Sequence, residues 1–234
     1  MENYNTTNVE IPANEIKLMG TIYYKSKLSG KRPWIINLPG LMEHRESYFV
    51  KFFTERFVAS NYNVLSYDYR AHGETADQTG KNWLKMIPQI FSDIIKVIDW
   101  VFDKHTEKID NISLFGRSLG GAIILTHGYN DTRPKKLIAL CTRYDYHSFK
   151  LDFPEEVIQK MSPRYFLKNS PTNNTKILLA HCKDDPQIPY ENVNQIQASL
   201  SLVEENVIRY EEGGHSFKGH REELFKKCLH FLEN

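Results

Sequence analysis

The residues with the clearest chemical potential form a short run, Gly116-Arg117-Ser118-Leu119-Gly120, in which a serine has a glycine two positions away on each side. An apolar stretch typical of a buried strand, 112–115, precedes the run, and an apolar stretch typical of a helix, 122–125, follows it. Glycines at these positions let neighbouring backbone approach a tight strand-to-helix turn, which raises the serine hydroxyl at the carboxyl edge of a sheet. The pattern predicts that Ser118 is a nucleophile; a Gly-Ser turn without chemistry is the alternative reading.

Such a serine needs two kinds of help. The first amides of the following helix, beginning with Leu119, point toward the site and favour a developing oxyanion. A serine hydroxyl is also a weak nucleophile, so a histidine must accept its proton. Of the nine histidines, His215 is placed best, because it follows the last predicted strand and the pliant pair Gly213-Gly214. His220 is the second candidate.

The histidine in turn needs an acid that orients its ring. Asp184 and Asp185 directly follow the predicted strand 176–181, in a loop that Pro186 and Pro189 close. We favour Asp185 as the acid. Asp145, beyond the preceding strand, is an alternative, and solvated loop charge is the ordinary interpretation of an Asp-Asp pair.

The rest of the chain supplies elements that can position these residues. Apolar runs predict a hairpin over 9–24, with its turn at 12–14, and strands at 34–38, 63–67, 112–115, 136–141, 176–181 and 207–210. Spacing near 3.6 residues predicts helices over 48–59, 90–101 and 221–232. Strands that alternate with helices indicate right-handed crossovers and a largely parallel sheet, so we expect one α/β domain spanning 1–234.

One interval, 144–175, departs from this alternation. Pro154, Pro163 and Pro171 punctuate it around a predicted short helix at 155–168, and it is rich in aromatic and basic residues. We interpret it either as a small lid over the site or as a peripheral connection that packs aromatic rings on the core.

Composition excludes several classes of protein. The chain is 41% hydrophobic and 25% charged, as soluble globular proteins are, and a formal net charge of +1 argues against general attraction to nucleic acid or anionic membranes. No run approaches the 18 apolar residues of a spanning helix, and the polar stretch 1–9 lacks the regions of a signal peptide. We therefore expect a cytoplasmic protein with a small-molecule substrate; oligomeric state is left open.

The three cysteines, Cys141, Cys182 and Cys228, are odd in number and widely spaced. This spacing argues against a disulfide framework and against a zinc site. Cys141 and Cys182 lie in apolar runs and are expected to be core thiols. We expect neither a metal nor a cofactor.

Taken in order, these motifs resemble the α/β-hydrolase superfamily, in particular its esterase, monoacylglycerol-lipase-like and serine-aminopeptidase-like branch. The resemblance covers nearly the whole chain. Its carriers are the runs at 19–23, 38–41 and 67–75, the Ser118 turn, Asp185-Pro186-Gln187-Ile188-Pro189 and Gly214-His215. It implies a mostly parallel eight-stranded sheet with helices on both faces and a small lid insertion. In such relatives the aspartate before Pro-x-Ile-Pro is the acid, which supports Asp185, and the 67–75 loop is structural.

The chain departs from the family pattern at two places. Relatives have His-Gly before the oxyanion loop, whereas this chain has Pro39-Gly40. The amide of Leu41 can still donate, because a backbone N–H does not depend on the preceding side chain. Where relatives often have glycine before the acid loop, this chain has Cys182, which changes packing and removes no catalytic residue.

The resemblance implies a metal-independent serine hydrolase that acts on carboxylic esters. Ser118 would attack, His215 would carry the proton, Asp185 would orient the ring, and the amides of Leu41 and Leu119 would bind the oxyanion. Short to medium acyl groups, or an aromatic acyl group such as feruloyl, are the expected substrates, since feruloyl-esterase-like proteins share the resemblance. The alternatives are a peptidase or thioesterase with the same triad, or a non-catalytic binding module of the same fold.

Overall fold

A computed structural model describes residues 4–28, 32–105, 112–149, 151 and 153–234. The predicted insertion 144–175 therefore lies within the described residues except at 150 and 152, and the polar stretch 1–9 except at 1–3. The eight strands are β1 (Asn5–Ala13), β2 (Ile16–Tyr24), β3 (Trp34–Leu38), β4 (Asn63–Tyr67), β5 (Ile112–Arg117), β6 (Lys136–Leu140), β7 (Ile177–Cys182) and β8 (Val207–Tyr210).

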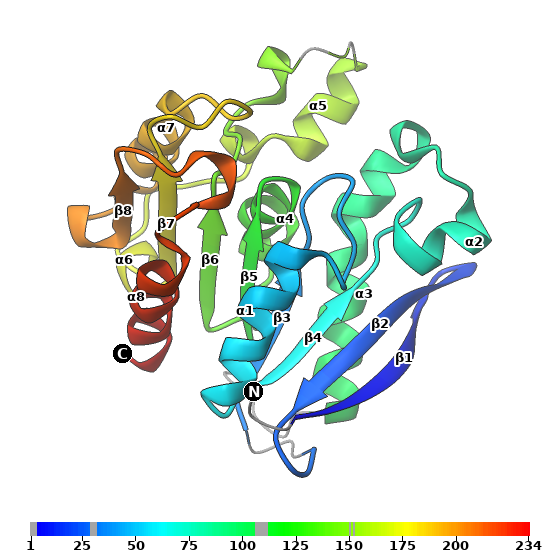
Figure 1. Ribbon diagram of the computed structural model, residues 1–234. Coiled ribbons are helices and arrows are strands. Elements are labelled where there is room, and N and C mark those ends of the chain that lie inside the picture. The colour runs from blue at the N-terminus through cyan, green and yellow to red at the C-terminus, as the bar shows by residue number, and fades with distance from the viewer. Residues whose placement is uncertain (1–3, 29–31, 106–111, 150, 152) are drawn as a thin grey trace.

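These strands form one sheet in the order β1-β2-β4-β3-β5-β6-β7-β8 (Figure 1). The β1–β2 hairpin is antiparallel and joins β4 antiparallel, whereas the other strand pairs are parallel. The predicted eight-stranded, mostly parallel sheet is confirmed.

Helices cover both faces of the sheet, as predicted. They are α1 (Tyr48–Ala59), α2 (Ala76–Thr79), α3 (Ile87–His105), α4 (Leu119–Ile123), α5 (Glu155–Met161), α6 (Asn173–Lys176), α7 (Glu191–Leu200) and α8 (Arg221–Glu233). Short helical turns are η1 (Gly73–Thr75), η2 (Trp83–Met86), η3 (Ile124–Gly128, a π-helical turn), η4 (Tyr146–Ser148), η5 (Pro163–Tyr165), η6 (Glu204–Asn206) and η7 (Gly214–Ser216).

Neighbouring residues of a strand point to opposite faces of the sheet, and helices cover both faces, so the central strands are buried on both sides. Phe115 packs with the apolar residues of α1 and α8 on one face. Leu114 packs with those of α3, α4 and α7 on the other. The near-continuous apolar runs of the sequence thus form a sheet between two helical layers.

The structure differs from the predictions in several places; helix α3, for example, spans Ile87–His105 where 90–101 was predicted. Pro12 lies within β1, and the hairpin turns instead at Asn14, whose φ is 57°. The helix predicted at 155–168 ends at Met161, because Ser162 precedes a proline and adopts an extended conformation. Helix α7 was not predicted: it buries few apolar side chains, so its periodic signal is weak.

Among the described residues, no helix combines the length and the apolar character needed to cross a membrane.

Candidate active site

Ser118 lies at the junction of β5 and α4, at the carboxyl end of the sheet, as the glycine spacing predicts. Its φ of 57° and ψ of −115° place it in a strained backbone conformation for a residue with a side chain. The Ser118 N–H donates to the carbonyl of Leu140 at 2.8 Å, which ties the turn to the neighbouring strand β6. The sheet therefore holds the serine in a conformation that the isolated chain would avoid.

The flanking glycines allow close packing beneath this turn. A Cβ on Gly120 would lie 2.8 Å from the carbonyl oxygen of Pro39, and a Cβ on Gly116 would lie 2.9 Å from the carbonyl carbon of Gly120. Because real Cβ atoms do not approach backbone so closely, both positions require glycine. The turn can thus lie directly against the loop after β3, which carries Leu41.

The structure brings His215 and Asp185 together. His215 Nδ1 lies 2.7 Å from Asp185 Oδ2, and since an ionised carboxylate only accepts, Nδ1–H is the donor. The other oxygen, Oδ1, accepts the N–H groups of Gln187 at 2.8 Å and Ile188 at 3.0 Å. Burial raises the pKa of Asp185, but the hydrogen bond and charge of His215 with these two amides outweigh it and lower the pKa to about 2. Asp185 is therefore ionised at neutral pH.

The competing acids and base lie elsewhere. Asp184 accepts the backbone N–H groups of Gly213 and Gly214, at 3.1 and 2.8 Å, and so holds the loop that carries the histidine. Asp145 pairs with His147 and Arg164. The ring of His220 stacks on Tyr210, with 4.4 Å between centroids.

Arg117, inside the Gly-x-Ser-x-Gly run, connects three parts of the site. Its Nη1 donates to Ser216 Oγ at 2.9 Å and to the carbonyl of His215 at 3.3 Å, and its Nη2 donates to Glu43 Oε1 at 2.6 Å. Arg117 thereby links the serine strand to the histidine loop and to the loop after β3. The sequence motifs predicted no role for Arg117, although a charged residue inside an otherwise apolar run is a signal of one.

The loop after β3 is shaped by two further side chains. Glu43 Oε2 accepts the N–H of Gly40 at 2.8 Å, and His72 Nε2 accepts the N–H of Met42 at 3.1 Å. The Nδ1–H of His72 donates to a backbone carbonyl at 2.9 Å. Burial lowers the pKa of His72, which keeps it neutral and able to accept from Met42. The 67–75 loop thus supports the site.

Between these fixed amides, the N–H of Leu41 makes no hydrogen bond within the described part of the chain. Leu119 is the first residue of α4, so its N–H has no acceptor within the helix. Both residues line the same small cavity as Ser118. The arrangement offers two backbone donors beside the serine.

The hydroxyl of Ser118 makes no hydrogen bond to another described residue. The structure therefore pairs the predicted base with the predicted acid, and brings the backbone of His215 against Arg117, the neighbour of the serine. It does not pair the serine hydroxyl with the His215 ring.

The cavity beside Ser118 has a volume of about 40 Å³ and an almost wholly apolar lining. Its lining residues are Leu41, Trp83, Ile87, Ser118, Leu119, Arg143, Tyr146, Phe149, Met161 and Ile188. The predicted insertion contributes part of the wall, and Figure 1 shows its helix α5 beyond the end of the sheet to which β5 and β6 point. Arg143 is the one charged residue among those that line it.

Cys141, expected to be a core thiol, is buried beside the acid. One ligand atom each of Cys141, Asp185 and His215 lies within 4.8 Å of the others, a grouping that metal sites also show. Burial and the Asp185 carboxylate raise the pKa of the thiol well above its usual value, so the free thiol is protonated at neutral pH. The acid and base already bond each other, so the group is arranged as a hydrogen-bonded cluster.

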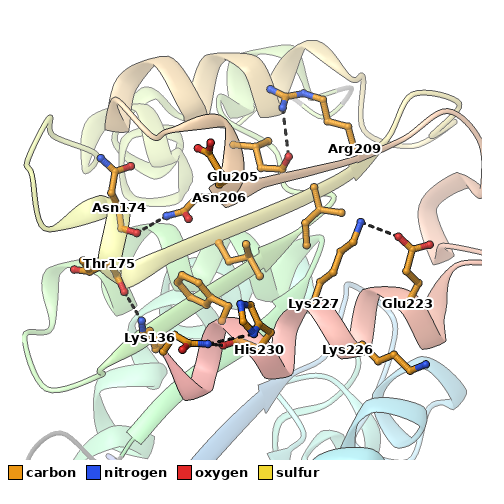
Figure 2. Close-up of a pocket in the computed structure, with 15 residues that line it drawn as sticks. Lys136, Asn174, Thr175, Glu205, Asn206, Arg209, Glu223, Lys226, Lys227 and His230 are labelled. Atoms are coloured by element: carbon orange, nitrogen blue, oxygen red, sulfur yellow. Dashed lines mark hydrogen bonds and ion pairs between the residues drawn. The ribbon is translucent and has the colours of Figure 1, made fainter.

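A larger hollow, of about 830 Å³, lies near the amino ends of β6 and β8 (Figure 2). Lys136, the first residue of β6, lines it together with residues of β8 and α8. Figure 2 shows Lys136 directed toward Thr175 and Lys227 toward Glu223. Ser118 follows the carboxyl end of β5, and the two cavities share no lining residue, so this hollow is separate from the candidate active site.

Comparison with known proteins agrees with this architecture. Residues 30–176 match the serine aminopeptidase S33 family. The quorum-quenching protein AidA of Acinetobacter baumannii is 28% identical over 141 residues, which are 57% of this chain and 43% of that protein. An uncharacterized 31.7 kDa protein of Escherichia coli is 31% identical over 112 residues, which are 47% of this chain and 37% of that protein. The chain thus spans less than half the length of these relatives.

Solved structures share the fold at low identity. Est1E from Butyrivibrio proteoclasticus, solved with ferulic acid, is 20% identical with a TM-score of 0.76 over 96% of this chain and 98% of its own. The acylaminoacyl peptidase of Pyrococcus horikoshii is 17% identical with a TM-score of 0.79 over 98% of this chain and 41% of its own. Because the family match covers more than half of the chain and the solved structures share its fold, this chain belongs to the serine aminopeptidase S33 family of α/β-hydrolases.

Proposed function

We propose that this chain is a serine hydrolase that cleaves carboxylic esters through an acyl-enzyme. The observation that carries the proposal is the buried hydrogen bond from His215 to Asp185, on a loop that Arg117 ties to the Ser118 turn. An ionised acid on Nδ1 leaves Nε2 of the imidazole free to accept a proton, as a serine nucleophile requires.

In the proposed reaction, Ser118 Oγ attacks the acyl carbonyl while His215 Nε2 takes the hydroxyl proton. The oxyanion of the tetrahedral intermediate lies between the N–H groups of Leu41 and Leu119, each contributing about 3 kcal/mol of transition-state stabilisation. Collapse expels the alcohol, which receives the proton from His215. Water then attacks the acyl-enzyme with His215 again as base, and the carboxylic acid leaves. The serine–histidine contact forms in the substrate complex, since catalytic hydrogen bonds are often loose without substrate.

The direct test is covalent labelling with a fluorophosphonate, which reacts with activated serines. We expect labelling of the wild type, none of Ser118→Ala, and unchanged labelling of Ser92→Ala, whose serine is exposed on α3. Wild-type protein that resists the reagent and hydrolyses no ester would instead favour a non-catalytic module.

The substrate proposed is an ester with a short, medium or aromatic acyl group such as feruloyl. The aromatic side chains of Trp83, Tyr146 and Phe149 in the lining of the cavity support this proposal. We also propose that 144–175 acts as a lid. Rates on p-nitrophenyl esters of two to sixteen carbons and on methyl ferulate test the range; fastest turnover of the longest chains would contradict it.

A peptidase is the second candidate, because the family is named after a serine aminopeptidase and a serine, histidine and aspartate triad can also cleave amides. Comparing kcat/KM on aminoacyl p-nitroanilides with that on the p-nitrophenyl esters separates the two. A larger value on the anilides would replace the ester proposal.

A further inference from the structure

Arg143 is a buried cation in the wall of the cavity that contains Ser118. It lies three residues beyond the end of β6, and only 7% of its surface is exposed. The other lining residues are apolar, except for the serine itself and the tyrosine hydroxyl. A charge in such a place is costly unless a counter-charge or hydrogen bonds compensate it.

The described residues that bond Arg143 are all neutral. Its Nη1 donates to Ser148 Oγ at 2.8 Å and its Nη2 to the carbonyl of Gln187 at 3.4 Å. The rings of Tyr146 and Phe149 have their centroids 5.9 and 5.4 Å from its Cζ. A guanidinium has five N–H groups, so three have no acceptor among the described residues.

Other buried or partly buried arginines of the protein differ in this respect. Arg70 pairs with Asp93, and Arg117 pairs with Glu43. Asp145, only two residues from Arg143 in the chain, is engaged by Arg164 and His147. Within the described part of the chain, no carboxylate lies within ion-pair distance of Arg143. Arg143 thus differs from Arg70 and Arg117 in having no counter-charge among the residues that the structure describes.

From this we infer that Arg143 is a subsite for a carboxylate carried by the substrate. The planar guanidinium matches the geometry of a carboxylate better than any other side chain does. The apolar lining of the cavity strengthens the electrostatic attraction between the two groups. The substrates implied are half-esters of dicarboxylic acids, or esters whose alcohol is a hydroxy acid. This inference rests on the proposed function, because it assigns the second end of the molecule that Ser118 would cleave.

A structural role for Arg143 predicts a different pattern. Its bond to Gln187 touches the loop that carries Asp185, so loss of Arg143 would then slow neutral and anionic esters equally. A carboxylate subsite instead makes the loss selective for anionic esters and places it mainly in KM. The ratio between matched esters therefore distinguishes the two roles.

The experiment compares esters that differ only in a carboxylate or a carboxamide. Monomethyl succinate and methyl succinamate carry the group in the acyl half; O-acetylglycolate and O-acetylglycolamide carry it in the alcohol. We expect kcat/KM to favour the carboxylate by about tenfold or more in one of the two pairs, as for a hydrogen bond to a charged group. Arg143→Met should abolish the preference and Arg143→Lys should restore part of it. Arg164→Met, which removes an exposed and already paired arginine, should leave it unchanged.

Binding to the Ser118→Ala protein, measured by calorimetry, separates this inference from the proposed function. Tighter binding of the carboxylate member without turnover by wild type would uphold the subsite and overturn the hydrolase. Turnover of neutral esters, with equal kcat/KM and equal affinity for the two members of each pair, would uphold the hydrolase and overturn the subsite. Equal loss on both members in Arg143→Met would also overturn the subsite. If that variant does not fold, the ratios in the wild type and in Ser118→Ala still decide.

Discussion

Replacing Asp185 by asparagine removes a charge and hardly changes the shape of the side chain. The amide oxygen can keep the bonds from the Gln187 and Ile188 N–H groups, now 2.8 and 3.0 Å long, which turns its NH₂ toward His215. Nδ1 of His215 must then accept, so the ring proton moves to Nε2. That nitrogen can no longer take the proton of Ser118.

We expect kcat/KM of Asp185→Asn on p-nitrophenyl acetate to fall by about 10⁴-fold, the size of effect that a wrong histidine tautomer causes. The neighbouring Asp184→Asn is the matched control. Its amide oxygen keeps one of the two bonds from Gly213 and Gly214, so we expect a loss below about tenfold. Retention of more than a tenth of the activity by Asp185→Asn, or an equal loss in Asp184→Asn, would refute this assignment.

The same substitution changes stability in a defined range of pH. The pKa of Asp185 falls on folding from 3.8 to about 2, which corresponds to roughly 2 kcal/mol of stability. This contribution is fully present above pH 3.8 and is lost as the pH falls toward 2, because the unfolded chain then binds the proton first. In urea denaturation, the stability difference between wild type and Asp185→Asn should shrink by about 1 kcal/mol between pH 7 and pH 3. A constant difference would contradict the lowered pKa.

Three further outcomes follow from packing and charge. Gly120→Ala would place a Cβ 2.8 Å from the Pro39 carbonyl oxygen and should cost about 1–3 kcal/mol, seen as a lower melting temperature; an unchanged value would contradict the packing. Arg70→Met would leave Asp93 buried without its 2.7 Å partner and should cost about 3–5 kcal/mol in urea denaturation, most of which the double variant with Asp93→Leu should recover. Unfolding free energy should decrease as the pH falls below 6.5, because the unfolded chain then binds protons at histidines whose pKa is lowered in the folded protein. These histidines are the buried His72 and His181 and the half-buried His105 and His127, and a flat profile between pH 7.5 and 5.5 would oppose this.

Much of the fold could be predicted because its causes are local. Strands buried on both faces need continuous apolar runs, and α1 was predicted at its observed bounds from the spacing of its phenylalanines. The end of α5 at Met161 could also have been found, since Pro163 restricts the residue before it. Helix α7 escaped prediction because only a narrow part of its surface meets the core.

Part of the candidate site could likewise be predicted from the sequence, and part could not. The turn at Ser118 and the order serine, acid, histidine are readable in the sequence, because glycines and strand ends mark where such residues must lie. Asp184 and Asp185 are adjacent and chemically identical, so the sequence favoured Asp185 mainly through the family resemblance. The folded loop shows that Asp185 bonds the His215 ring and that Asp184 bonds its supporting backbone.

The amino-acid sequence alone determined the layers of this protein and the chemical types at one edge of its sheet, because periodicity and backbone preference act over a few residues. Only the tertiary structure decided that Arg117 reaches Glu43 and Ser216 and that Arg143 meets no carboxylate among the described residues. Those partners lie as many as 99 positions apart in the chain, and a contact at that separation depends on how the whole sheet is assembled.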